Sequence, residues 1–316
     1  MKAKEMGRKT IKGVNNIVNL VVLTVIILLL AFAGYALWDS NQLYNAADKS
    51  HYAVYKPTAK DEGKSFKELQ ALNTEVIAWL SVYGTNIDYP VTQGGDNMKY
   101  VNTNVEGQYS LSGAIFLDCD NNSDFSDFKN ILYGHHMDKK VMFGEIGEFS
   151  DKKMFDDHRY GNLYFDGKDH GIEFFAFIHT DAYDSCIFTL NTKNENRQEY
   201  LDELLAKAVY QRDVGVAVGD HIVLLSTCSS GSTNGRDILA GKITDELYDD
   251  PFVKTQTNGV RELFSVDGKR SFLEKVPQWL LWLTVILAVL ILAAFIFVYH
   301  HKRKQSKSKP KRERDI

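Results

Sequence analysis

The sequence predicts one mainly β domain with helices, folded as a closed barrel of short strands and held between two membrane spans. Three observations predict this class. Two long apolar stretches lie near the ends of the 316-residue chain. Between them, short β-like runs alternate with Gly, Asn and Asp turns, and one amphipathic segment interrupts these runs. Many short strands at this spacing favour a closed barrel, because closure leaves no unpaired strand edge.

The two apolar stretches cover residues 17–38 and 279–299, and neither carries a charge. Each is long enough to cross roughly 30 Å of hydrocarbon as a helix. The first stretch has an alternative interpretation as a cleavable signal peptide, since basic residues precede it and Ala31-Phe32-Ala33 resembles a cleavage site. We favour a retained anchor, because the apolar run continues past these alanines to Trp38.

The chain termini are basic, with 5 of the 37 Lys and Arg residues in segment 1–16 and 8 in segment 300–316. The positive-inside rule therefore places both termini in the cytoplasm and residues 39–278 outside the membrane. We divide that outer part into a polar stalk, a folded domain and a connector, at residues 39–64, 65–248 and 249–278.

The charge of the remaining chain narrows the class of partner. Residues 17–299 hold 24 basic and 38 acidic side chains, a net charge of −14. Such a field argues against nucleic acid or another anionic polymer as a partner and is compatible with amine-bearing partners. Solubility alone would also explain it.

The folded domain is expected to begin with one or two short helices. Ser65 and Glu68 have the spacing of a capping box. Apolar residues then recur with helical spacing on both sides of a break at Asn73-Thr74, at Phe66, Leu69 and Leu72 and again at Val76, Ile77 and Leu80.

Strands are expected from Thr85 to about Tyr248. The β-like runs are residues 86–92, 113–118, 130–134, 161–166, 171–180, 221–228 and 237–244. Residues 197–209 predict an amphipathic helix instead, with its apolar face at Tyr200, Leu201, Leu204, Leu205 and Ala208.

Three cysteines occur, and an odd number leaves at least one free thiol in an exported domain. We expect Cys119, at a strand end, and Cys186, near a strand start, to be structural thiols. A disulfide between these two is the alternative. Cys228 differs, because it ends an apolar strand and precedes a polar loop of Ser, Gly and Asn.

Arg236 starts the next strand after that loop. If the two strands pair as antiparallel neighbours, the thiol and the guanidinium share one rim of the sheet. A nearby permanent cation stabilises the thiolate form, which is the nucleophile. The alternative is a small buried Cys228 and a solvated Arg236.

A cysteine nucleophile also needs a proton-transfer partner, usually histidine. His135 directly follows a strand, where Gly134 lets the backbone turn. We assign no catalytic role to His136. A metal site at His135, His136 and Asp138 is the competing use, yet the chain has no HxxxH, CxxC or HExxH spacing.

These residues carry a resemblance to a known family. The YGH of 133–135, the LSTC of 225–228 and Arg236 resemble the three signature elements of sortases, transpeptidases that join surface proteins to the Gram-positive cell wall or polymerise pilins. The likeness covers about 180 residues, from Ser65 to roughly Leu247. Segments 71–91, 110–118 and 137–146, with the helix at 197–209, resemble class B sortases in particular.

The resemblance implies a closed eight-stranded barrel with N-terminal helices and an extra helix before the cysteine strand. It implies Cys228 as the nucleophile, His135 as the general acid and base, and Arg236 as the group that orients substrate and stabilises the oxyanion. Ser226 and Thr227 would help to wall the groove for the C-terminal sorting signal. The implied acceptor is an amine of the cell wall or of a pilin lysine, with no metal or organic cofactor.

One feature departs from the class B pattern. A second span with a basic tail is more typical of class C sortases, which polymerise pilins. Their aspartate-aromatic lid motif is not evident in residues 39–64, and Asp250-Pro251-Phe252 follows the domain instead. Two other functions stay open: a cell-wall cysteine peptidase that releases its thioester to water, and a non-enzymatic binding module on a membrane hairpin.

Overall fold

The computed structural model describes residues 2–58, 63–190, 194–229 and 233–252. The described residues divide into two compact units, one up to Asp39 and one from Ser40 onward. Helix α1, Lys2–Ala46, contains a segment, Ile11–Ala46, that is long and apolar enough to cross a membrane; an N-terminal signal sequence passes the same test. The second span expected at 279–299 and the basic tail lie outside the described residues.

The polar segment after the first span is more ordered than a bare stalk. Helix α1 continues past Trp38 to Ala46, and two short 3-10 helices follow, η1 Lys49–His51 and η2 Ala53–Tyr55. Ala47 and Tyr52 are buried in the core of the larger unit. The end of the expected stalk therefore packs onto the folded domain, because it carries apolar side chains among its polar ones.

The predicted N-terminal helix is present as α2, Lys64–Leu72, but it begins after Gly63, at φ 70°, and not at a capping box of Ser65. Its Phe66 and Leu69 are buried. The apolar residues after Asn73 form strand β1 and not a second helix. β-branched Val and Ile favour the strand, and six of its seven residues are buried.

Nine strands are found in the part of the chain that the structure describes. They are β1 Val76–Val82, β2 Asp88–Thr92, β3 Ile115–Leu117, β4 Lys129–Tyr133, β5 Tyr160–Phe165, β6 Lys168–Asp181, β7 Ala208–Gln211, β8 His221–Cys228 and β9 Gly235–Thr244. Eight of them close into a ring in the order β5-β1-β2-β3-β4-β8-β9-β6, because β5 pairs with both β1 and β6. The expected closed eight-stranded barrel is confirmed, and β7 adds to β6 outside the ring.

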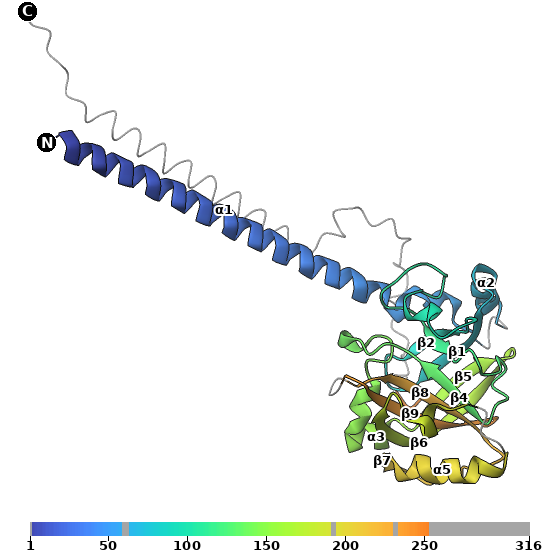
Figure 1. The fold of residues 1–316 in the computed structure, drawn as a ribbon. Helices are drawn as coiled ribbons and strands as arrows, with labels where there is room; N and C mark the ends of the chain where they lie inside the picture. Colours follow the sequence, from blue (N-terminus) through green and yellow to red (C-terminus); the bar gives the residue numbers. More distant parts are fainter. Residues whose placement is uncertain (1, 59–62, 191–193, 230–232, 253–316) are drawn as a thin grey trace, which may run out of the picture. The chain divides into compact units, whose positions relative to one another are not determined.

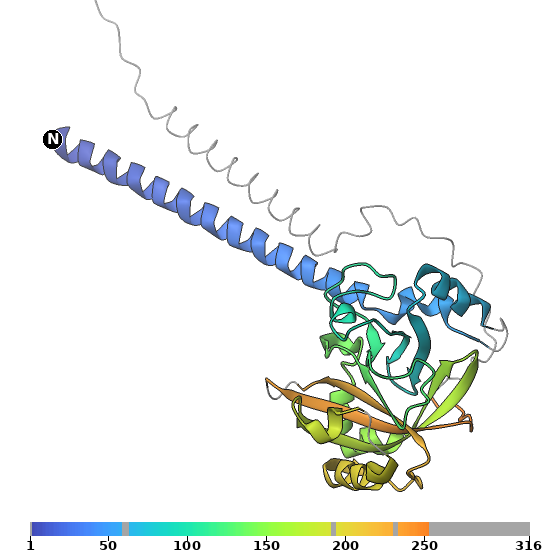
Figure 2. The same ribbon diagram turned by 45° about the vertical axis from the view of Figure 1, so that its right-hand side comes forward.

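Strand β8 is buried on both faces, which explains why it reads as a continuous apolar run. Val223 and Leu225 point into one core, and Ile222 and Leu224 into a second. The second core lies between the sheet and helix α5, Arg197–Ala206, which Figures 1 and 2 show on the opposite side of the barrel from α2. Side chains alternate between the two faces of the sheet along β8. The position of a residue at the end of this strand therefore determines the face to which its side chain points.

The remaining short helices are η3 Lys99–Val101, η4 Asp138–Lys140, η5 Ile146–Ser150, α3 Lys152–Asp157, α4 Ser185–Phe188 and η6 Asn194–Asn196. The helix predicted over 197–209 is α5, with Tyr200, Leu201 and Leu204 buried as expected. It ends at Ala206, and the following residues form β7. Cys186 lies in α4 and not near a strand start, since Asp184 caps a helix there through the Cys186 backbone N–H.

Lys129 of β4 attaches the α4 and α5 region to the sheet. Its Nζ donates to the backbone oxygens of Ile187 at 2.8 Å and Thr189 at 2.7 Å, and it lies 4.2 Å from the centre of the Tyr200 ring. Burial opposes the positive charge and lowers the pKa of Lys129 to about 8.

This lowered pKa predicts a pH dependence of stability. Between about pH 8 and the usual lysine pKa of 10.5, the unfolded chain keeps this proton and the folded chain loses it. The free energy of unfolding should therefore rise with pH across that window. Denaturant unfolding of the wild type relative to Lys129→Met should show a gain of about 1–2 kcal/mol between pH 7.5 and 9.5. Exposed Lys168→Met is the control, and a difference that does not change with pH would contradict the assignment.

Tyr89 of β2 joins the N-terminal segment to the loop that follows β4. Its buried hydroxyl donates to Ala47 O at 3.0 Å and accepts the Met142 N–H at 3.1 Å. Tyr89→Phe leaves both backbone groups without this partner, so we expect a loss of about 1–3 kcal/mol in the free energy of unfolding. Tyr109→Phe, at a residue 75% exposed, should change it little. Equal stabilities of the two variants in denaturant would refute the linkage.

Candidate active site

Cys228 and Arg236 meet at the rim of the barrel. Cys228 is the last residue of β8, and Arg236 near the start of β9 is its direct cross-strand partner. Directly opposed residues of an antiparallel pair lie on the same face of the sheet, so the thiol and the guanidinium share one face as the sequence predicts. Cys228 is exposed, so its thiol can meet a substrate.

The turn after β4 places His135 beside this strand end. The Gly134 N–H donates to Ser226 O at 3.2 Å, and the Thr227 hydroxyl donates to Gly134 O at 2.8 Å. A Cβ at position 134 would stand 2.7 Å from the Phe143 ring, so only glycine fits here without movement of that ring. Hydrogen bonds thus join the residues that precede Cys228 to the residue that precedes His135.

The imidazole of His135 has a fixed orientation. Its Nε2 lies 2.7 Å from the backbone oxygen of Val101, at the end of η3. A carbonyl oxygen only accepts hydrogen bonds, so Nε2 carries the proton in this contact. In the neutral ring the second nitrogen, Nδ1, is then the base. A backbone carbonyl here does the orienting that a carboxylate does in many catalytic triads.

One cavity of about 360 Å³ contains all five residues that the sequence singled out. His135, Ser226, Thr227, Cys228 and Arg236 all line it. Five further residues, none of which the sequence analysis assigned a role, share the lining with Gly134, and they are Asn97, Val101, Ala114, Phe116 and Tyr133. The cavity can therefore present a thiol, an imidazole and a guanidinium to one bound molecule.

Ser226 and Thr227 differ in what they can offer to a substrate. The Thr227 hydroxyl is engaged by Gly134 O, so its contribution is to hold the backbone that leads to His135. The Ser226 hydroxyl is buried and finds no partner among the described residues. A buried unsatisfied hydroxyl is costly, so Ser226 is the better donor for a ligand group in this cavity.

Tyr133 and Asn97 belong to a network that sequence reasoning missed. The Tyr133 hydroxyl and the Asn97 amide both donate to Asp118 Oδ2, at 2.9 and 3.0 Å. Burial and the Asp118 carboxylate raise the pKa of Tyr133 well above its usual value, so the phenol stays protonated. Tyr133 stood within the YGH motif, but no pattern marked Asn97 or Asp118, which reach the site only through the fold.

The other two thiols lack the environment of a nucleophile. All three cysteines are free, so the alternative disulfide between Cys119 and Cys186 is absent from the structure. Burial raises the pKa of Cys186 to about 11, and burial with nearby carboxylates raises that of Cys119. Both shifts disfavour the thiolate.

The geometry does not favour the competing metal site. Within the described ranges, one group of potential ligands has its atoms close enough to share an ion: Asp118, Cys119 and Asp120. His135, His136 and Asp138 do not form such a group. The ring of His135 is instead engaged by the Val101 carbonyl.

Comparisons with known proteins agree on one family. A scan against protein-family models finds no match. Sortase B of Staphylococcus aureus is 31% identical over 182 residues, which is 56% of this chain and 74% of that protein.

Two solved structures are similar as well. A sortase B from the type II pilus of Streptococcus pneumoniae is 46% identical, with a TM-score of 0.51 over 57% of this chain and 99% of its own. A Streptococcus pyogenes class B sortase involved in pilus biogenesis is 40% identical, with a TM-score of 0.52 over 58% of this chain and 99% of its own. The matched length includes nearly all of each solved chain, and the barrel with its thiol at a strand end fits the resemblance first indicated by the motifs. This chain therefore belongs to the sortase B family.

Proposed function

We propose that this protein is a membrane-anchored cysteine transpeptidase that cuts a C-terminal sorting signal and joins the cut end to an amine. The observation that carries the proposal is the pairing of Cys228 with Arg236 at the strand end, with His135 lining the same cavity. Each group has a distinct task in acyl transfer.

In the first half-reaction, the Cys228 thiolate attacks a backbone carbonyl of the sorting signal. The carbonyl oxygen becomes an oxyanion, which the Arg236 guanidinium stabilises by charge and hydrogen bonds. The C–N bond then breaks, and protonated His135 gives its proton to the departing amine. The product is a thioester on Cys228 and a neutral imidazole.

In the second half-reaction, an acceptor amine attacks the thioester carbon. Neutral His135 takes a proton from the attacking nitrogen as the C–N bond forms. The C–S bond breaks, and the thiolate of Cys228 returns beside protonated His135. The two steps balance in atoms and electrons, so the cycle needs no external oxidant or reductant.

Anchoring in the membrane would raise the effective concentration of both substrates, which are tethered at the same surface. Helix α1 supplies a segment of suitable length and composition for one anchor. The placement of the catalytic unit outside the membrane, and a second span at 279–299, rest on the charge pattern of the sequence.

For the client we favour a pilin over a wall-attached surface protein. Two pilus-associated class B sortases share 46% and 40% identity with this chain, against 31% for the staphylococcal sortase B. The acceptor would then be a lysine side chain of another pilin subunit.

The test is to incubate the full chain with secreted proteins of its own organism and with a lysine-bearing peptide, and to search for cross-linked peptides by mass spectrometry. We expect a new amide between a cut C-terminal signal and the supplied amine. Release of only hydrolysed signal would support the peptidase alternative, and no cleavage at all would support the binding module.

A further inference from the structure

A second cavity, of about 830 Å³, lies beside the first on the same strand ends. The first cavity, which contains the Cys228 thiol, is called the thiol cavity. At three places in the chain, one residue lines the thiol cavity and the next residue lines the second cavity. His135, Cys228 and Arg236 line the first cavity, whereas the next residue in each case, at His136, Ser229 and Asp237, lines the second. Successive side chains of extended backbone point to opposite faces, so the two cavities approach the same strand ends from opposite sides.

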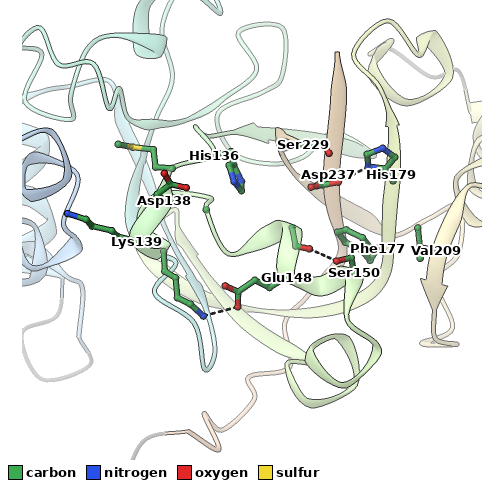
Figure 3. A pocket seen from close by; sticks show the side chains of 14 residues that line it. His136, Asp138, Lys139, Glu148, Ser150, Phe177, His179, Val209, Ser229 and Asp237 are labelled. Atoms are coloured by element: carbon green, nitrogen blue, oxygen red, sulfur yellow. Dashed lines mark hydrogen bonds and ion pairs between the residues drawn. The ribbon is translucent and has the colours of Figure 1, made fainter. Parts of the chain in front are cut away.

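Asp237 is the central charge of this second cavity. It is 7% exposed, and its Oδ1 accepts the Nδ1–H of His179 at 2.8 Å. Among the described residues, no lysine or arginine pairs with Asp237. Figure 3 shows His136 on the side of the cavity that faces Asp237, with His179 beside Asp237. A buried carboxylate without a lysine or arginine partner favours a cationic ligand.

The lysines of the cavity are already engaged. Lys140 pairs with Glu148 at 2.8 Å and with Glu145 at 3.5 Å. Lys139 donates to Asn41 Oδ1 at 3.3 Å. Neither neutralises Asp237, so the cavity is suited to a cation and not to an anion.

Gly147 leaves the Asp237 carboxylate uncovered, because any side chain at residue 147 would lie against it. A Cβ at Gly147 would stand 3.1 Å from Asp237 Oδ2 and 4.0 Å from His136 Cε1, so this point lies between the carboxylate and the imidazole. The buried Nδ1 of the His136 imidazole has no hydrogen-bond partner among the described residues. A donor entering beside that ring can supply one.

The apolar residues that line the cavity favour one kind of cation. Phe177, Val209 and Met137 line the cavity alongside its charged groups. A lysine side chain packs its aliphatic stem on apolar surface while its ammonium group reaches a charge. An N-terminal glycine amine has no such stem.

We propose that this second cavity is the acceptor subsite: it holds the lysine side chain of the incoming substrate, with the ammonium group against Asp237, before the amine reaches the thioester. The inference rests on the proposed transpeptidation. The sorting signal occupies the thiol cavity, so the acceptor approaches from the other face of the strand ends. The ammonium group loses one proton to water as it leaves Asp237, and His135 takes the second as the C–N bond forms and the C–S bond breaks.

The first test needs no sorting signal. Binding of Nα-acetyl-lysine amide to the full chain in lipid nanodiscs is measured by saturation-transfer NMR, with Nα-acetyl-norleucine amide and triglycine amide as comparison ligands. Asp237→Asn removes the charge, and Gly147→Ala places a methyl group against the Asp237 carboxylate; each should weaken lysine binding by about tenfold or more. Asp245→Asn, on a surface carboxylate, and Gly219→Ala, where a Cβ meets nothing within 4 Å, are the matched controls.

The outcomes separate this inference from the proposed function. Cys228→Ala should bind the lysine probe as the wild type does, because the thiol lies in the other cavity. Equal lysine binding by wild type, Asp237→Asn and Gly147→Ala overturns the subsite, as does binding of norleucine amide or triglycine amide at least as tight as that of lysine amide. Once a donor sorting signal has been identified, kinetics can be measured. Asp237→Asn and Gly147→Ala should each raise KM for the lysine acceptor and leave the rate of thioester formation unchanged. A thioester that forms while KM stays constant refutes the subsite alone.

Discussion

Cys228→Ala is expected to abolish formation of the new amide, by at least about 10⁴-fold, because no other group in the cavity can form the acyl intermediate. Besides the thiol, the cavity supplies an imidazole, a guanidinium and the hydroxyls of Ser226 and Thr227, and none of these replaces a thiolate as the nucleophile. The rate of cross-linked peptide formation, followed by mass spectrometry with the full chain, measures the effect.

Cys186→Ala is the matched control. This thiol lies in α4, and burial raises its pKa to about 11, so it contributes no nucleophile. The rate of cross-linked peptide formation by Cys186→Ala should stay within a few-fold of the wild-type rate. If Cys228→Ala retained activity while Cys186→Ala lost it, the assignment of the nucleophile would be wrong.

Arg236→Ala is expected to lower kcat by about 10²–10³-fold, since the proposed mechanism places this cation at the developing oxyanion. Arg236→Lys should recover only part of this loss. An ammonium group keeps the charge but lacks the planar, multidentate donor geometry of a guanidinium. Single-turnover kinetics of thioester formation on Cys228 would report the effect on the acylation step itself.

Lys242→Ala provides a control on the same strand. Lys242 also lies on β9, but it pairs with Asp220 and does not line the thiol cavity. It should leave the acylation rate within a few-fold of the wild type. An Arg236→Ala enzyme with unchanged acylation would remove Arg236 from the mechanism.

The part of the site that could be predicted from the sequence is the part set by local geometry. Cys228 and Arg236 flank one short loop, so antiparallel pairing of the two strands brings them together without help from the rest of the chain. His135 follows its strand through Gly134, and β4 pairs directly with β8, so its approach also depends on neighbouring strands.

What the sequence did not predict depends on contacts between distant segments. The Val101 carbonyl reaches His135 across 34 positions of the chain, and a backbone oxygen leaves no mark in a sequence pattern. The resemblance predicts that Thr227 walls the substrate groove; the residue lines the thiol cavity, and its hydroxyl donates to Gly134 O at a separation of 93 residues. Such partners follow only from the folded arrangement.

The errors in secondary structure have a similar cause. The residues of β1 are apolar at both helical and strand spacing, and burial on both faces removes the alternation that marks a half-exposed strand. Strand β7 is four residues long and begins two residues after the end of α5, so the predicted helix over 197–209 includes its first two residues, Ala208 and Val209. In both cases the pairing partner, β2 or β6, decides the structure.

The account depends most directly on a thioester at Cys228, and that species can be measured. The full chain is mixed with a lysate of its own organism or a peptide library without an added amine, and the intact protein and its peptides are weighed by mass spectrometry. We predict an acyl adduct on the Cys228 peptide that disappears, with formation of an amide, when a lysine-bearing peptide is added. An adduct confined to Cys119 or Cys186, or a cleaved signal with no adduct on any thiol, would contradict the account.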